Sequence, residues 1–302
     1  MKPSARGAAR EQDRRRLLLA CCLTALILAA EVAGGLATGS LALLSDAGHV
    51  FTDLLALLIA FFAATLATRP ATARKTWGYH RLEVLSALVN GVLLAGIGLL
   101  ILREAWLRLG TPRPVHTPGM MAIAALGLAG NLAGVWLLSS GSGSINLKAA
   151  LWHVMGDTVS SVAVLLGGLV IALTGAVRVD PLLSMALALV ILIGAVHLLR
   201  EAAHVLLEGV PGELDCESVE AAMRSVPGVT EVHDLHIWSI TSGRAALSGH
   251  VVVPRTPGAD IEAVLRDVKI LLRDRFDIEH TTIQIEPAGF EEIGEIHAPF
   301  ET

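Results

Sequence analysis

Two histidine–aspartate pairs lie inside stretches of the sequence that are otherwise almost entirely apolar. His49 and Asp53 are four residues apart, and so are His153 and Asp157. On a helix, residues i and i+4 share a face, so each pair presents one imidazole nitrogen and one carboxylate oxygen together. Two such faces placed opposite each other supply four ligands, which is enough for a tetrahedral Zn²⁺ site. Imidazole suits zinc-like metals better than Mg²⁺ or Ca²⁺, so we predict one zinc-type site shared by the two segments.

The cost of placing these groups in an apolar medium supports a shared site. Each ionisable side chain near the centre of a bilayer costs roughly 2.5–3.5 kcal/mol on insertion scales, so the five such groups are expected to face one another, water or an ion. The fifth group is Asp46, three residues before His49 and on the same face. It is predicted either to support the site or carry a proton, or to be a helix-start residue near the membrane surface. The alternative for all five is a polar network that only fixes helix packing.

The ligand types also suggest a source of energy for moving the metal. Metal binding requires neutral histidine and ionised aspartate, so metal arriving at the site expels protons, and an empty site takes them up. Exposing such a site alternately to the two sides of a membrane would exchange metal for protons.

The composition indicates a polytopic membrane protein. Of 302 residues, 53% are apolar and 17% are charged, whereas soluble domains have about 45–50% and 25%. A net charge of −5 gives no support to nucleic-acid binding, and three cysteines are too few for a disulfide framework.

Six stretches are long and apolar enough to cross a bilayer, which takes about 20 residues in a helix. Basic residues are concentrated before the first stretch and between the second and third, which places both termini in the cytoplasm. The predicted spans are 17–37, 42–67, 84–103, 119–139, 147–173 and 181–199.

The rest of the chain reads as a small soluble domain with the order α-β-β-α-β. Its predicted elements are helices over 214–225 and 259–276 and strands over 232–241, 247–253 and 280–286. We therefore expect four parts, which are a basic cytoplasmic N-terminus over 1–16, a transport domain over 17–208, a cytoplasmic domain over 209–290 and a tail over 291–302.

Several segments together resemble the cation diffusion facilitator family of zinc and divalent-cation exporters. They cover nearly all of residues 17–288, and each is weak alone but the set is specific. The matching segments are Ser45-Asp46-Ala47-Gly48-His49 with Asp53, Trp77-Gly78-Tyr79-His80-Arg81-Leu82-Glu83-Val84, His153 to Asp157, Leu206-Leu207-Glu208-Gly209-Val210-Pro211, Val232-His233-Asp234-Leu235-His236-Ile237-Trp238 and His280-Thr281-Thr282-Ile283-Gln284-Ile285-Glu286.

This resemblance implies a homodimer in the cell membrane, with six transmembrane helices and a cytoplasmic α+β ferredoxin-like domain in each chain. It implies export of Zn²⁺ in exchange for H⁺, with Cd²⁺ and Co²⁺ as further substrates and no organic cofactor, and it gives the same four transport ligands. It also implies a charge pair at the dimer, for which Arg81 and Glu208 match, and metal as a regulatory ligand of the cytoplasmic domain. The candidate ligands there are His233, His250, His280 and Glu286.

Two features depart from the family, and two other function classes compete with a transporter. The stretch 139–144 has no histidines, which disfavours a cytoplasmic metal-collecting loop there. Residues 68–76 contain neither Asp nor His, so we predict no metal site in that loop. An intramembrane zinc protease is disfavoured because the chain lacks an H-E-x-x-H motif. The other alternative is a membrane-anchored sensor, in which the cytoplasmic domain binds zinc as a signal and the six spans only anchor it.

Two asparagines lie inside predicted spans. Asn90 and Asn131 either pack the helices or line a cavity.

Overall fold

The structure is a computed structural model that describes residues 5–67, 71–139, 145–241, 243–255 and 260–290. The chain forms two compact units. The helical unit comprises Met1–Phe62 and Ser86–Leu199, and the tail unit comprises Ala63–Leu85 and Arg200–Thr302.

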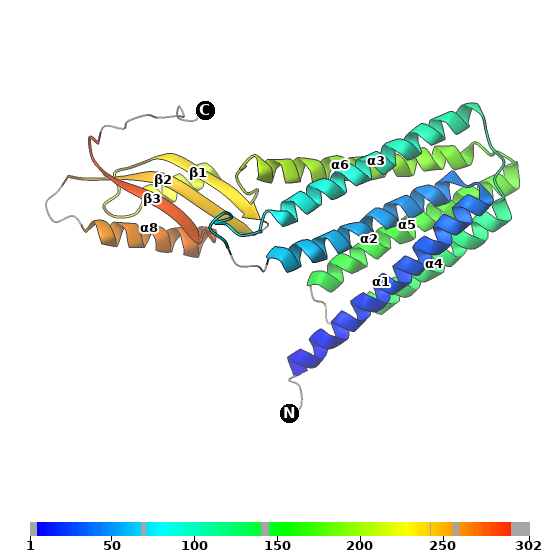
Figure 1. The fold of residues 1–302 in the computed structure, drawn as a ribbon, viewed down its shortest axis with the longest axis horizontal. Coiled ribbons are helices and arrows are strands. Elements are labelled where there is room, and N and C mark those ends of the chain that lie inside the picture. Colours follow the sequence, from blue (N-terminus) through cyan, green and yellow to red (C-terminus); the bar gives the residue numbers. More distant parts are fainter. Residues whose placement is uncertain (1–4, 68–70, 140–144, 242, 256–259, 291–302) are drawn as a thin grey trace. The chain divides into compact units, whose positions relative to one another are not determined.

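Six long helices make up most of the chain (Figure 1). Five of them contain a segment long and apolar enough to cross a membrane, and α2, with 27 residues, is the sixth. Together with a small sheet domain after them, they confirm the predicted fold class. The helices are α1 (Ala5–Thr38), α2 (Leu41–Ala67), α3 (Leu82–Gly110), α4 (Thr117–Ser139), α5 (Ile145–Thr174) and α6 (Val179–Leu206).

The helices extend beyond the predicted spans at several ends. The apolar run predicted for the third span stops at residue 103, whereas α3 continues to Gly110. In the added turns the Glu104 carboxylate accepts a hydrogen bond from Arg108 Nε at 3.0 Å, a helical i,i+4 pair. Apolar runs therefore locate the central part of a helix, and helical hydrogen bonding continues into the polar turns beyond it.

Within the helical unit, α3 and α6 form one closely packed pair (Figure 1). Buried residues of both helices make a common core, and Gly91 and Gly98 leave no room for a side chain against Leu199 and Leu192. A second core joins the start of α2 to α4 and α5, and a third joins α1, α4 and α5. The segments predicted to share the metal site thus belong to one cluster of helices.

The start of α2 is fixed by a buried carboxylate from α6. Asp180 accepts hydrogen bonds from Ser40 Oγ at 2.6 Å, from Leu41 N at 2.8 Å and from Ala42 N at 3.2 Å. These donors are among the groups that a helix N-terminus leaves without intrahelical partners. Gly39, with φ +71°, makes the tight turn from α1 into α2. Asp180 thereby sets the position of the helix that carries His49 and Asp53.

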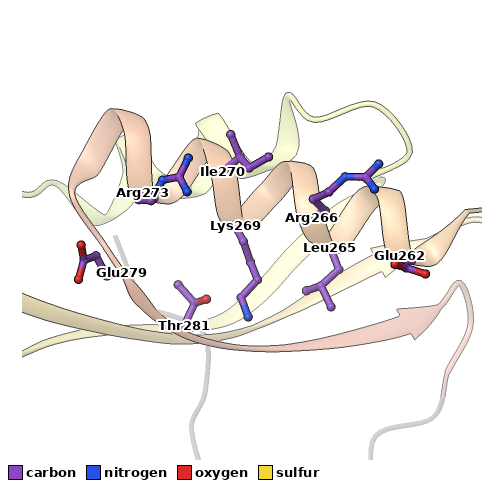
Figure 2. Close-up of a pocket in the computed structure, with 8 residues that line it drawn as sticks. All are labelled: Glu262, Leu265, Arg266, Lys269, Ile270, Arg273, Glu279 and Thr281. Carbon is purple, nitrogen blue, oxygen red and sulfur yellow. The ribbon is translucent and has the colours of Figure 1, made fainter.

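The tail unit contains a three-stranded sheet in the order β1-β2-β3, with β1 antiparallel to β2 and β2 parallel to β3. The crossover between β2 and β3 is α8, and apolar side chains of α7, α8 and the sheet form one core. A shallow groove between α8 and β3 is lined by residues that include Leu265, Lys269 and Thr281 (Figure 2). The elements are α7 (Cys216–Arg224), β1 (Glu231–Thr241), β2 (Arg244–Val253), α8 (Ile261–Phe276) and β3 (His280–Pro287).

Candidate metal centres

The structure brings three of the four predicted transport ligands together. One ligand atom each from His49, Asp53 and Asp157 lies within 4.8 Å of the others, and His49 Nε2 is 3.5 Å from Asp53 Oδ2. The first two residues are on α2 and the third is on α5, where it is 3% exposed. Around Zn²⁺ at about 2.0 Å, tetrahedral ligand atoms are about 3.3 Å apart, so small side-chain movements would close this group around an ion.

The fourth predicted ligand, His153, lies on α5 one helical turn before Asp157, and its side chain is outside the described part of the structure. Its membership of the site therefore stays a prediction based on the i,i+4 spacing, which places it on the same face as Asp157.

Asp46 lies inside the helical unit and links α2 to α5. It is 3% exposed, and its carboxylate accepts a short hydrogen bond from the Ser160 hydroxyl. A carboxylate buried in this way, one helical turn from His49, holds the two helices that supply the ligands at a fixed spacing.

Glu31, on α1, has a place in the site that we did not predict. It is 1% exposed, and its carboxyl group interacts electrostatically with those of Asp46 and Asp157. The only signal in the sequence is that it is the single acidic residue of an apolar stretch. Of the two buried asparagines, Asn131 donates a hydrogen bond to Ser161 at 3.1 Å and so joins α4 to α5.

A second group of possible ligands lies in the tail unit. His233 on β1 and His250 on β2 are paired across the hairpin, with ring centroids 5.2 Å apart. Glu286 on β3 is 3% exposed, and its carboxylate lies 3.0 Å from His250 Nδ1 and 3.4 Å from His233 Nε2. One ligand atom from each of the three lies within 4.8 Å of the others, so each strand of the sheet contributes one residue.

An irregularity in β1 brings a second carboxylate near this group. The register between β1 and β2 shifts between His233 and His236, and Asp234 within the shift has φ +48°. A non-glycine residue rarely adopts this left-handed conformation. Asp234 lies 3.0 Å from His236 Nε2 and 3.8 Å from His250 Nε2. The sequence gives no signal for such a bulge.

The predicted ligand His280 does not lie with His233, His250 and Glu286, which together are called the tail group. In the parallel pairing of β3 with β2, Ala246 faces His280, whereas His250 faces Gln284 four residues further on. At about 3.3 Å per residue, this places His280 about 13 Å from the level of His250. Its ring instead packs edge-on against Trp77, with centroids 4.4 Å apart.

The two residues of the predicted charge pair are in contact within one chain. Arg81 Nη2 is 2.9 Å from Glu208 Oε1, and both belong to the tail unit. Neighbouring contacts join the same segment to the sheet, because the Thr241 hydroxyl donates a hydrogen bond to Glu83 and Arg244 lies 3.2 Å from His80 Nε2. The pair therefore connects the start of α3 to the residues that follow α6.

Two family models match the chain. The cation efflux transmembrane domain matches residues 17–207, and the cytoplasmic domain of cation efflux proteins matches residues 211–288. The cation efflux system protein CzcD of Alcaligenes sp. is 44% identical over 92% of this chain and 88% of its own length. The zinc transporter ZitB of Escherichia coli is 42% identical over 91% and 88%, respectively. A cadmium, cobalt and zinc/H(+)-K(+) antiporter of Bacillus velezensis is 40% identical over 86% and 84%. The chain therefore belongs to the cation efflux family of multi-pass membrane transporters, which are not enzymes, in agreement with its resemblance to the cation diffusion facilitators.

Proposed function

We propose that this protein exports Zn²⁺ from the cytoplasm in exchange for protons, through a site formed by His49, Asp53, His153 and Asp157. The observation that carries the proposal is the convergence of His49 and Asp53 from α2 with Asp157 from α5, with ligand atoms within 4.8 Å of one another. These donors are of the types that Zn²⁺ takes in proteins, and Cd²⁺ and Co²⁺ are further substrates for the same set.

The exchange follows from the chemistry of the ligands. The site binds metal with its imidazoles neutral and its carboxylates ionised, so protons leave as metal arrives. When the site opens to the other side of the membrane, protons compete with the metal for the same nitrogen and oxygen atoms, and their binding releases it. Alternating access of one site to the two sides then couples metal export to proton entry. The names of the zinc transporter and the proton-linked antiporter among the relatives support this function.

We further propose that the protein is a homodimer in the cell membrane with both termini in the cytoplasm. The excess of basic residues in the N-terminal segment supports this orientation. The match to the cytoplasmic domain of cation efflux proteins supports a cytoplasmic tail unit.

The tail group of His233, His250 and Glu286 is proposed as a regulatory site for cytoplasmic metal. Its three ligands leave one position of a tetrahedron to water or to a further side chain. Metal bound there would tie the three strands together, because each strand contributes one ligand.

Zinc uptake into inverted membrane vesicles tests the transport site. Asp157→Ala removes a buried ligand, so uptake should be lost while the chain remains folded and inserted. Asp274→Ala, which removes an exposed carboxylate paired with Arg273 in the tail unit, is the control and should leave uptake unchanged. Retained uptake in the Asp157 variant would overturn the proposed site. Uptake that continues at the same rate after the proton gradient is collapsed would overturn proton exchange.

Calorimetry on the full chain distinguishes metal bound at the transport site from metal bound at the tail group. We expect His250→Ala and Asp157→Ala each to remove one bound zinc ion per chain, and only the second variant to abolish uptake. If uptake is abolished in both variants while His250→Ala loses only the tail ion, metal at the tail site is required for transport.

A further inference from the structure

The carboxyl group of Glu31 is buried in the helical unit but does not belong to the three-residue ligand group. Its Oε2 atom has no hydrogen-bond partner among the described residues. A buried carboxyl oxygen without a partner costs free energy, so its retention in the core calls for another explanation.

The packing of α1 against α4 leaves space for this carboxyl group. A Cβ atom placed on Gly127 would lie 2.8 Å from Glu31 Oε1 and 3.6 Å from the Ser161 hydroxyl. The absence of a side chain at Gly127 is therefore what admits the carboxyl group between α1, α4 and α5. One turn along α4, the nearest atoms to a Cβ on Gly130 would instead belong to Ile27 and Leu23.

Among the described residues, the two ionisable groups found to act on Glu31 are both acidic. Glu31 interacts electrostatically with Asp46 of α2 and Asp157 of α5, and α4 contains no ionisable residue. Among the described residues of the helical unit, the buried carboxylates are those of Glu31, Asp46, Asp157 and Asp180. Both carboxylate oxygens of Asp180 already accept hydrogen bonds at the N-terminus of α2. One carboxylate oxygen of Asp46 accepts a hydrogen bond from the Ser160 hydroxyl. Glu31 thus offers an oxygen that no described protein group uses.

The backbone position of Glu31 lies toward one end of the helices. At 1.5 Å per residue, Glu31 is about 10 Å and Asp46 about 8 Å from the turn between α1 and α2, whereas the ligands His49 and Asp53 are about 12 Å and 18 Å from it. A divalent ion moving from the ligand group toward this turn therefore passes the level of Glu31 and Asp46. Without compensating charge, an ion in a medium of low dielectric is opposed by tens of kcal/mol.

We propose that Glu31, with Asp46, forms a second binding station for the divalent cation, between the His49, Asp53 and Asp157 group and the end of the helices at the α1–α2 turn. This inference rests on the proposed function and deepens it, because it divides the exit of the metal into two steps. The ligand group sets the affinity for the metal, and the station lowers the barrier for its release.

Reconstituted protein with zinc as the only probe tests the station. Two rates are measured, namely net zinc uptake driven by a proton gradient and exchange of radioactive zinc for unlabelled zinc at equal pH, together with the zinc dissociation constant by calorimetry. Glu31→Gln keeps the shape of the side chain and removes its charge. We expect both rates to fall by roughly tenfold or more and the dissociation constant to stay within about twofold of its original value. Glu31→Asp should restore part of both rates.

Gly127→Ala and Gly130→Ala are a matched pair of variants. Each adds one methyl group between α1 and α4, but the nearest atom to the first is the Glu31 carboxyl oxygen, whereas the nearest to the second is in the Ile27 side chain. The first should therefore slow both rates, and the second should leave them close to the original.

Three outcomes would contradict the proposal of a second binding station. Unchanged zinc–zinc exchange in Glu31→Gln, with only net uptake lost, would assign the residue to protons rather than to metal. A dissociation constant weakened as strongly as in Asp157→Ala would make Glu31 a ligand of the first group. Equal effects of the two glycine variants would reduce the role of Glu31 to packing. Failure of the proposed function is distinguishable, because there Asp157→Ala itself would retain uptake.

Discussion

Removing the Asp180 carboxylate tests whether this residue positions the helix that carries two of the ligands. Asp180→Ala deletes three hydrogen bonds at once, from Ser40 Oγ and from the backbone amides of Leu41 and Ala42. All of these residues are buried, with exposures between 0% and 4%. The substitution therefore leaves donors at the start of α2 with neither protein nor bulk water to accept from them.

The expected loss of stability follows from these contacts. Hydrogen bonds to a charged group contribute roughly 1.5–3 kcal/mol each, and bonds that share one carboxylate are not additive. We expect Asp180→Ala to lower the free energy of unfolding by about 3–5 kcal/mol, and Asp180→Asn, which keeps an accepting oxygen, by about half as much. Because α2 carries His49 and Asp53, zinc affinity should fall by roughly tenfold in the alanine variant even though Asp180 is not a proposed ligand.

The assay combines denaturation of the purified protein in detergent with zinc calorimetry on the same samples. The graded order, with the original chain most stable and the alanine variant least, is the specific expectation. An alanine variant within 0.5 kcal/mol of the original, or one that loses stability while zinc affinity is untouched, would refute the argument that this carboxylate holds the ligand helix in place.

Three further predictions concern the tail unit. Arg81→Glu should cost at most about 1 kcal/mol, because both partners of its ion pair are largely exposed, and adding Glu208→Arg should restore the melting temperature; a swap that restores nothing would show that the pair contributes nothing. Asp277 ends α8 at φ +56°, so Asp277→Gly should stabilise this end by about 0.5 kcal/mol, measured as slower hydrogen exchange of the last turn of α8. Hydrogen bonds from Ser218 hold the pKa of Asp215 below its ordinary value. The stability that these hydrogen bonds contribute is complete above the pKa of about 3.9 that Asp215 has in the unfolded chain. It is lost as pH falls through the lower pKa that Asp215 has in the folded chain, so the helical signal of α7 should decrease in acid. In Asp215→Asn the helical signal should not change over this range.

Features set by local spacing could be predicted from the sequence. The i,i+4 rule placed His49 and Asp53 on one face of a helix, and the structure brings that face to Asp157. The strand pattern predicted the two consecutive strands that carry His233 and His250, and the structure pairs these residues across the hairpin. Both predictions need only the geometry of one element or of two consecutive ones.

Features set by contacts between distant elements could not be predicted. The role of Asp180 depends on α6 meeting the start of α2, which lies 138 to 140 residues away in the chain. The place of Glu31 depends on a glycine of α4 that gives it room. The structure does not place His280 beside the other tail ligands of the same chain, because the parallel register of β3 with β2 separates residues that share a face of the strand.

The most direct test of the central claim is to count the zinc ions that the full chain binds when ligands of α2 and of α5 are removed singly and together. His49→Ala and Asp157→Ala should each abolish the same bound ion, so the double variant should lose one ion per chain and no more. A double variant that loses two ions, or single variants that keep the full number and affinity, would show that the two helices do not hold a common metal.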